Sequence, residues 1–311
     1  MRKKTILVLG AGGFLASKFI HKYKKKYKII SSFKSRKKSN QKIFSGTKKV
    51  IENILKSQKI YDFGKIDVAI YSVALNTEKS AKNKVESKKV NYDGIKNFCK
   101  KITKNKIKNV IKLSTIKVYG QNPNFKINER SIYNPQDNYS RHILKSDLYF
   151  EKFCKRNDIN YKILRVSNGF GVPAINSKES IRVLLNNFVY QATKYNKISI
   201  NSKYNIIKNF IRIEDIVKGI DFFVKNNSID EGTYLMGGKF NYNLYSISNI
   251  IKKNIQNLFG NKTSVEYKFN KKKFINKNFN LDTNKLSKLG YRVPRKEKEE
   301  IINLIKFYIR N

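Results

Sequence analysis

The chain has few of the features that mark secreted or membrane proteins. Its 311 residues include only two cysteines, Cys99 and Cys154, which lie far apart and form no metal or redox motif. We expect both to be packing residues in a reducing cytoplasm. No apolar run reaches about 18 residues, so no membrane span is expected. The first 15 residues combine basic residues with an apolar run, but glycines break that run and no cleavage site follows, which favours a buried strand over a signal peptide.

Acidic residues are also scarce. The chain has 22 Asp and Glu against 67 Lys and Arg, a formal net charge of +45. Binding to nucleic acid or to an anionic membrane is one interpretation of such a charge. However, the basic residues are spread along the whole chain, with Lys, Asn and Ile used throughout, as expected from an AT-rich genome. No RNA-binding aromatic motif, helix-turn-helix or zinc module is present. We therefore expect no nucleic-acid partner, although this charge would attract an anionic substrate.

Short apolar runs alternate with longer mixed segments in the first half of the chain. Continuous β-branched runs are typical of strands buried on both faces of a parallel sheet, and here they alternate with helical patterns. Strands are expected at 5–9, 28–32, 67–71, 109–113 and 161–166, and helices at 80–101 and 138–157. This alternation predicts an α/β fold with a Rossmann-type doubly wound parallel sheet over residues 1–170. Residues 171–311 are predicted to form a smaller cap, with some segments returning to the core.

A glycine-rich turn follows the first strand directly. Gly10, Gly13 and Ala16 are spaced three apart, which suits a tight turn, a close approach to a pyrophosphate and a small contact where helix meets strand. The helix that follows, from Phe14 and Leu15 onward, would offer free N–H groups and its positive dipole end to phosphates. In this context the turn favours dinucleotide binding. A purely structural turn is the alternative.

The end of the second strand bears on the choice of dinucleotide. An NAD site usually carries an acid here for the ribose hydroxyls, and none is present. Ser32 and, further on, Arg36 would instead suit a 2′-phosphate. The sequence therefore favours NADP over NAD, unless Arg36 simply belongs to a basic surface loop.

Seven segments in chain order resemble motifs of the extended short-chain dehydrogenase/reductase family, the nucleotide-sugar epimerases, dehydratases and 4-ketoreductases. The resemblance spans nearly the whole chain, and its order makes chance a poor explanation. The segments are Gly10–Ala16 (the glycine loop), Asp67–Ala74, Val90–Gly94, Leu113–Gly120 (LSTIKVYG), Leu164–Pro173 (LRVSNGFGVP), Lys208–Asp215 (KNFIRIED) and Leu281–Pro294. The resemblance implies that Val73, Ala74 and Asn91 lie at the cofactor.

The resemblance also implies roles for four residues at the reaction centre. Thr115 matches the catalytic Ser/Thr that hydrogen-bonds the reacting sugar oxygen, and Tyr139 lies 24 residues later, where the family places its acid/base tyrosine. Asn168 matches the asparagine that holds the nucleotide diphosphate. Lys208 stands where an arginine usually clamps the pyrophosphate, and would act there as a point charge without the bidentate fork.

The predicted centre departs from the family at one position. The family motif is Y-x-x-x-K, and here Ile143 replaces the lysine, which in the family anchors the nicotinamide ribose and lowers the tyrosine pKa. On a helix, His142 shares the face of Tyr139, whereas Lys145 points elsewhere. His142 is thus a candidate substitute, although a histidine is only partly charged near neutral pH. It could equally be a solvated or capping residue.

Two further features constrain the chemistry. The 4,6-dehydratase branch places acids directly after the catalytic threonine, whereas Ile116 and Lys117 follow Thr115 here, so dehydration is not expected. The resemblance then implies an enzyme, an NAD(P)-dependent epimerase or 4-ketoreductase. Its substrate would be a nucleotide-diphosphate sugar for surface polysaccharide, and it would act as a possible homodimer. The missing lysine leaves a second hypothesis open, a catalytically impaired sensor or scaffold with the same fold.

Overall fold

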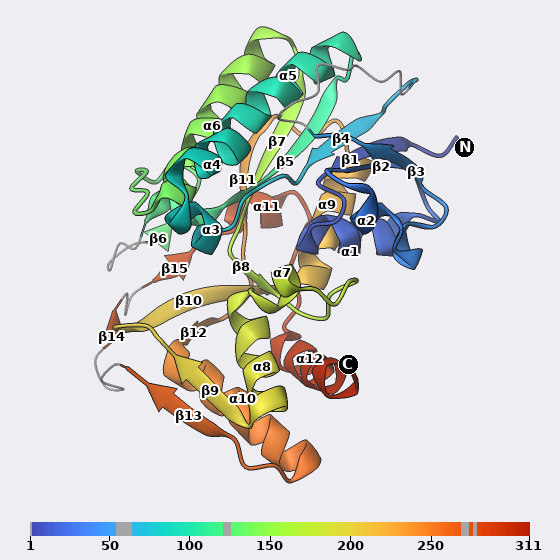
Figure 1. Cartoon of the computed structure of the whole chain (residues 1–311). Coiled ribbons are helices and arrows are strands. Elements are labelled where there is room, and N and C mark those ends of the chain that lie inside the picture. Colours follow the sequence, from blue (N-terminus) through green and yellow to red (C-terminus); the bar gives the residue numbers. More distant parts are fainter. Residues whose placement is uncertain (1, 54–63, 121–125, 269–273, 276–278) are drawn as a thin grey trace. The chain divides into compact units, whose positions relative to one another are not determined.

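The computed structural model describes residues 2–53, 64–120, 126–268, 274–275 and 279–311 (Figure 1). The chain forms two compact units, each built from several segments. The first comprises Met1–Gly120, Ile132–Arg165 and Val217–Tyr234, and the second comprises Gln121–Ser131, Val166–Ile216 and Leu235–Asn311. Part of the chain after residue 170 thus belongs to the first unit. In the described part of the chain, no helix is both long and apolar enough to cross a membrane.

A seven-stranded sheet forms the centre of the first unit, in the order β11-β7-β5-β4-β1-β2-β3. The pairs β3–β2, β2–β1, β1–β4 and β4–β5 are all parallel. Its strands are β1 (Thr5–Leu9), β2 (Lys28–Phe33), β3 (Lys48–Ile51), β4 (Val68–Tyr71), β5 (Asn109–Thr115), β7 (Asn160–Val166) and β11 (Gly232–Met236). The strand order reverses between β1 and β4. The predicted doubly wound parallel sheet is therefore confirmed.

Helices cover both faces of this sheet (Figure 1). On one side lie α3 (Thr77–Lys82), α4 (Lys84–Lys88), α5 (Gly94–Lys104) and α6 (Asn138–Arg156), and on the other α1 (Phe14–Tyr23), α2 (Arg36–Ser39) and the later part of α9 (Ile213–Lys225). The face under α5 and α6 is packed by Phe98, Cys99, Phe150 and Cys154, none more than 1% exposed. Both cysteines are free, buried packing residues, as the sequence predicts.

The helix expected at 80–101 is interrupted. Asn83 ends α3 and caps α4, accepting a hydrogen bond from the Glu86 backbone N–H. A π-helical turn, η2 (Lys89–Asp93), then precedes α5. Turns of this kind displace a side chain from the regular helical position and are frequent at functional sites. Here the turn carries Asn91, which is 1% exposed.

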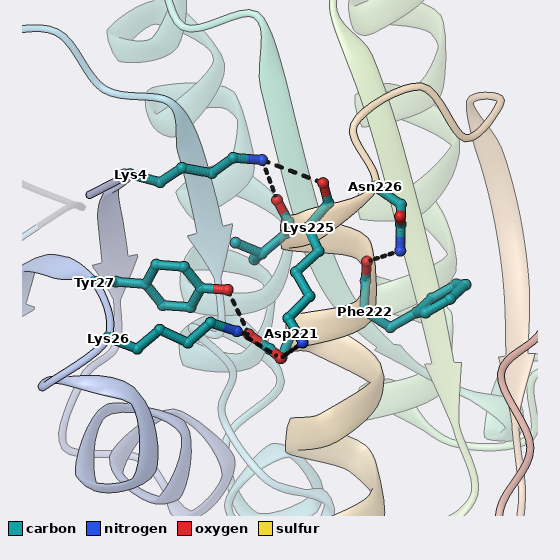
Figure 2. Close-up of polar contacts among 8 residues, drawn as sticks. Lys4, Lys26, Tyr27, Asp221, Phe222, Lys225 and Asn226 are labelled. Atoms are coloured by element: carbon teal, nitrogen blue, oxygen red, sulfur yellow. Dashed lines mark hydrogen bonds and ion pairs between the residues drawn. The ribbon is translucent and has the colours of Figure 1, made fainter. Parts of the chain in front are cut away.

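A buried carboxylate ties α9 to the first unit (Figure 2). Asp221 accepts a hydrogen bond from the Tyr27 hydroxyl (2.5 Å) and forms ion pairs with Lys26 (2.7 Å) and Lys225 (3.1 Å). Lys4 donates to the carbonyl oxygens of Val224 and Lys225 at 2.6 and 3.3 Å. A lysine at this position satisfies terminal carbonyls of a helix and complements its dipole. These contacts explain why a segment late in the sequence belongs to the N-terminal sheet.

The second unit has its own core of aliphatic and aromatic residues, including Phe188, Phe210, Ile251 and Leu304. Its helices are α7 (Lys178–Ile181), α8 (Leu184–Tyr195), the start of α9, α10 (Leu244–Phe259), α11 (Asn284–Lys288) and α12 (Glu297–Arg310). Its strands are β6 (Lys126–Ile127), β8 (Asn168–Phe170), β9 (Lys197–Ile200), β10 (Asn205–Arg212), β12 (Asn241–Asn243), β13 (Ser264–Tyr267), β14 (Phe274–Ile275) and β15 (Asn280–Leu281). Strand β10 pairs with β8, β12 and β14.

Candidate active site

Three neighbouring strands of the first unit end at the candidate site. Gly10 follows β1, Val73 and Ala74 follow β4, and Thr115 ends β5. Because β4 pairs in parallel with both β1 and β5, their carboxyl ends lie at one edge of the sheet. Ligands of doubly wound sheets bind outside this edge, where the strand order reverses. The sequence-predicted residues after the three strands are therefore brought together.

The turn after β1 has the geometry that requires glycine. Gly10 has a φ of +74°, and a Cβ atom on it would lie 2.8 Å from the Ser72 carbonyl oxygen, closer than real contacts allow. Gly13 caps α1 without a side chain, and a Cβ there would lie 3.1 Å from the Gly10 carbonyl oxygen. Ala16 is 1% exposed where the helix meets the sheet. Each of the three small residues is thus explained by a specific contact.

The start of α1 suits an anionic ligand. The first N–H groups of a helix have no intrahelical acceptor, and those of Phe14 and Leu15 are among them. No side chain caps this end, and no acid lies in the first turn. The helix dipole adds positive potential at the same place. The glycine turn and the helix start therefore fit the pyrophosphate of a dinucleotide.

We expect Gly10→Ala to abolish nicotinamide-cofactor binding and to destabilise the protein. Gly46→Ala is the matched control, because Gly46 also has a positive φ (+80°) but a Cβ there would meet nothing within 4 Å. The control should lose only the backbone cost of about 1–2 kcal/mol, whereas Gly10→Ala adds the clash with Ser72. Chemical denaturation and cofactor fluorescence titration measure the two effects. Unchanged cofactor binding in Gly10→Ala would show that the turn holds no dinucleotide.

Basic residues follow the end of β2. Ser32 is 5% exposed, and its carbonyl oxygen accepts a hydrogen bond from the Ala11 N–H at 3.0 Å, so this end of β2 supports the glycine turn. Arg36 begins α2 and is exposed. Lys38, which the sequence motifs do not single out, lies over the turn, because a Cβ on Gly12 would be 2.9 Å from its Cδ. The Lys38 side chain therefore stands close to the candidate dinucleotide site.

Asn91 supports the segment after β4. Its side chain accepts a hydrogen bond from the Leu75 N–H (2.7 Å) and donates to the Leu75 carbonyl (3.3 Å). It also donates to Ser80 and Ser87 at 3.3 Å each. The Ser87 hydroxyl is in turn hydrogen-bonded to His142 Nδ1 at 2.8 Å. Asn91 therefore shapes the backbone beside Val73 and Ala74, and His142 is the outer member of its network.

Thr115 and Tyr139 form the pair predicted for the reaction centre. Thr115 begins η3 (Ile116–Tyr119), and its Oγ1 accepts a hydrogen bond from the Lys117 N–H at 3.2 Å. Tyr139 lies in the first turn of α6, which Asp137 and Ser140 fix with reciprocal capping hydrogen bonds. Burial raises the pKa of Tyr139, and Asp137 and Asp147 raise it further. A side-chain hydrogen bond to Thr115 acts in the opposite direction.

The surroundings of His142 lower its pKa and so disfavour the charged form that a substitute cation would need. Burial lowers the pKa of His142, and the neighbouring Lys145, Lys84 and Lys88 lower it further, against the effect of Asp93. The ring is 7% exposed and bonded to Ser87. A neutral imidazole within the Asn91 network fits these contacts better than an imidazolium acting on Tyr139. Ile143 is 3% exposed and leaves no cation at the position of the family lysine.

Side chains of β5, α6 and β7 form a buried cluster of charged residues. Asp147 accepts hydrogen bonds from Lys112 (2.5 Å), Ser114 (2.7 Å) and Arg165 (3.3 Å). The guanidinium of Arg165 also donates to the hydroxyls of Tyr119 and Tyr133 at 2.5 and 3.2 Å. Lys112, Asp147 and Arg165 are each 1% exposed. Sequence spacing does not predict this cluster, although Arg165 falls within the family-like segment Leu164–Pro173.

The two predicted diphosphate-binding residues belong to the second unit. Asn168 starts β8, and its amide donates to the Asn209 carbonyl oxygen at 2.8 Å. Lys208 lies on the paired strand β10 and is half-buried. Further along β10, Arg212 forms a bidentate ion pair with Asp215, both contacts being 2.6 Å. This pair fixes the end of the strand that carries Lys208.

The doubly wound sheet and its glycine turn define a Rossmann-type α/β protein. The family model "NAD dependent epimerase/dehydratase family" matches residues 6–237, and the chain therefore belongs to this family. No curated protein matches the chain.

Solved structures with a similar fold cover nearly the whole chain. UDP-N-acetylglucosamine 4-epimerase from Methanobrevibacter ruminantium, bound to UDP-N-acetylmuramic acid, is 18% identical, with a TM-score of 0.85 and coverage of 100% of this chain and 99% of that one. UDP-glucose 4-epimerase from Thermotoga maritima, bound to UDP-glucose, is 17% identical, with a TM-score of 0.82 and coverage of 98% and 99%. A UDP-glucuronic acid 4-epimerase variant from Bacillus cereus, solved with NAD and UDP-4-deoxy-4-fluoro-glucuronic acid, is 18% identical, with a TM-score of 0.82 and coverage of 98% of this chain and 99% of that one.

Proposed function

We propose that the protein is an NAD(P)-dependent nucleotide-sugar epimerase or 4-ketoreductase that acts at C-4 of a nucleotide-diphosphate sugar. The observation that carries the proposal is that the Thr115 side chain lies close enough to Tyr139 to lower its pKa, in the unit that holds the glycine turn. The similar folds of three 4-epimerases, each solved with a UDP-sugar or its analogue, support this substrate class. A place in surface-polysaccharide synthesis and a homodimer remain parts of the proposal.

The residues divide the chemistry between them. Thr115 donates a hydrogen bond to the reacting sugar oxygen, and Tyr139 takes the proton from the 4-hydroxyl or returns it to the 4-keto oxygen. Asn168 and Lys208 hold the diphosphate. Gly10, Gly13 and the start of α1 would hold the nicotinamide cofactor, whose chemistry when bound would be hydride transfer. Because burial raises the pKa of Tyr139, its phenol form prevails at neutral pH in the free chain and favours proton donation to a ketone.

The test is a panel of UDP- and dTDP-linked hexoses and 4-keto sugars, incubated with NADH or NADPH and analysed by anion-exchange chromatography and NMR. Inversion at C-4 indicates the epimerase, and consumption of reduced cofactor with a 4-keto sugar indicates the reductase. A second candidate, the catalytically impaired sensor or scaffold, is favoured by Ile143 at the family lysine position. Tight cofactor binding without turnover of any sugar in the panel would select that candidate.

The cofactor preference has its own prediction. If Arg36 contacts the 2′-phosphate, Arg36→Ala should weaken NADPH binding by about 10- to 100-fold and leave NADH binding nearly unchanged, since one charge-assisted hydrogen bond contributes about 1.5–3 kcal/mol. Lys34→Ala is the control, because Lys34 is an exposed basic residue just before Arg36. Fluorescence titration with both cofactors measures the effect. Equal small losses in both variants would assign Arg36 to a general basic surface.

A further inference from the structure

The absence of a lysine at position 143 leaves Tyr139 without the cation that its chemistry requires. Burial, Asp137 and Asp147 all raise the pKa of Tyr139. A phenolate that takes a proton from a sugar hydroxyl needs a nearby positive charge to form near neutral pH. His142 does not meet this need, because burial and three lysines lower its own pKa. A positive charge beside Tyr139 would therefore have to come from another residue.

Lys117 is a cation that faces the Tyr139 ring. Its Nζ lies 5.7 Å from the centre of the Tyr139 ring, within the range of cation–π attraction. The Nζ donates a hydrogen bond to Thr77 Oγ1 at 2.8 Å, and the Lys117 N–H is bonded to Thr115 Oγ1. Lys117, two positions after Thr115, is thus held by one hydrogen bond at its ammonium group and another at its backbone N–H. The residue as a whole is exposed.

We propose that Lys117 supplies the positive charge beside Tyr139 that the fourth-position lysine of Y-x-x-x-K supplies in the family. It acts through Tyr139 and is a positioning residue for the reaction proposed above, on which this inference rests. The proposal places the cation on η3, after β5, instead of on α6. It accounts for two departures from the family at once, because the residue after Ile116 is a lysine where the dehydratases carry an acid, and the helix carries Ile143.

The electrostatic surroundings are consistent with this role. Asp137, which caps α6, and Asp147 on this helix favour the phenol form of Tyr139. Lys117 faces the Tyr139 ring from η3. On α3, Glu78 pairs with Lys82 at 3.1 Å. Lys84, Lys88, Asp93 and Lys145 act on His142. Burial lowers the pKa of Lys117, whereas the nearby carboxylate of Asp137 raises it and so favours the charged form.

The test is the ionisation of Tyr139, followed by NMR of protein carrying ¹³Cζ-labelled tyrosine, with the Tyr139 resonance assigned by its loss in Tyr139→Phe. Lys117→Met removes the charge and should raise the pKa of Tyr139 by about one pH unit or more. Lys117→Arg keeps the charge and should stay near the wild type. Lys145→Met is the matched control, an exposed lysine on α6, and should change nothing. The same order is expected for the rising limb of the kcat–pH profile in the oxidation direction.

The outcomes separate this inference from the proposed function. An unchanged Tyr139 pKa in Lys117→Met, with circular dichroism and Tm showing a folded protein, would overturn the role of Lys117. If Lys117→Met does not fold, an Arg variant with a wild-type Tyr139 pKa still supports the role, and one with a raised pKa contradicts it. A raised pKa in Lys117→Met, without turnover of any sugar nucleotide by the wild type, would sustain the inference and reject the enzyme.

Discussion

Tyr139→Phe is expected to lower kcat on the true sugar nucleotide by about 10²–10⁴-fold, because a positioned acid/base group contributes a factor of this size. The variant loses one hydroxyl, the partner of Thr115. Since α6 keeps its capping box through Asp137 and Ser140, the fold should be preserved. Steady-state kinetics with the active sugar, together with Tm, measures both effects.

Tyr149→Phe is the control for this prediction. Tyr149 lies on the same helix and is half-buried, but its ring packs against Tyr92 and Phe153, away from Thr115. Its loss of a hydroxyl should leave kcat and cofactor binding unchanged. If Tyr139→Phe retained full activity, Tyr139 would be a packing residue, and the proton would have to move through another group. If both variants lost activity equally, the loss would reflect the helix and not the chemistry.

Much of the fold could be predicted from the sequence, because its strands are buried on both faces. The continuous runs that become β1 and β4 carry no polar face to confuse the pattern. The glycine turn was equally clear, since each small residue has a local steric reason. Strand β3 has no comparable signal, because only Val50 of its residues 48–51 is buried. The interruption of the 80–101 helix also escaped prediction, because it depends on one cap, Asn83, and on contacts of Asn91 with distant backbone.

The positions of site residues could be predicted where they depend on place along a strand or helix, as for Thr115 and Tyr139, and could not be predicted where side chains meet across elements. The catalytic roles of Thr115 and Tyr139 stay predictions. Helical periodicity made His142 a candidate substitute cation, because on α6 it shares the face of Tyr139. The structure turns His142 toward Ser87, and Lys117 reaches Tyr139 from another element. Sequence spacing contains no information about such a contact between η3 and α6.

The largest effect on stability is expected at the buried charge cluster. Lys112 and Arg165 carry two positive charges against the single carboxylate of Asp147, so the cluster has a net charge of +1 inside the first unit. Asp147→Asn would leave two buried cations without a counter-charge. Removing one partner of a buried ion pair costs about 3–5 kcal/mol, because the remaining charge stays desolvated. Urea denaturation of the variant measures the loss.

Lys112→Met is the informative comparison, since it brings the cluster to zero net charge and leaves Asp147 bonded to Ser114 and Arg165. Its cost should be well below that of Asp147→Asn, although Lys112 makes the shortest contact with Asp147. Equal costs would mean that individual hydrogen bonds, and not the charge balance, stabilise this region. The Asn variant also removes a negative charge that raises the pKa of Tyr139. Where Asp147→Asn folds, the pKa of Tyr139 should therefore fall, whereas Lys117→Met should raise it. Measuring the Tyr139 pKa and the urea denaturation of the same variant separates the cluster's electrostatic effect on Tyr139 from its effect on stability.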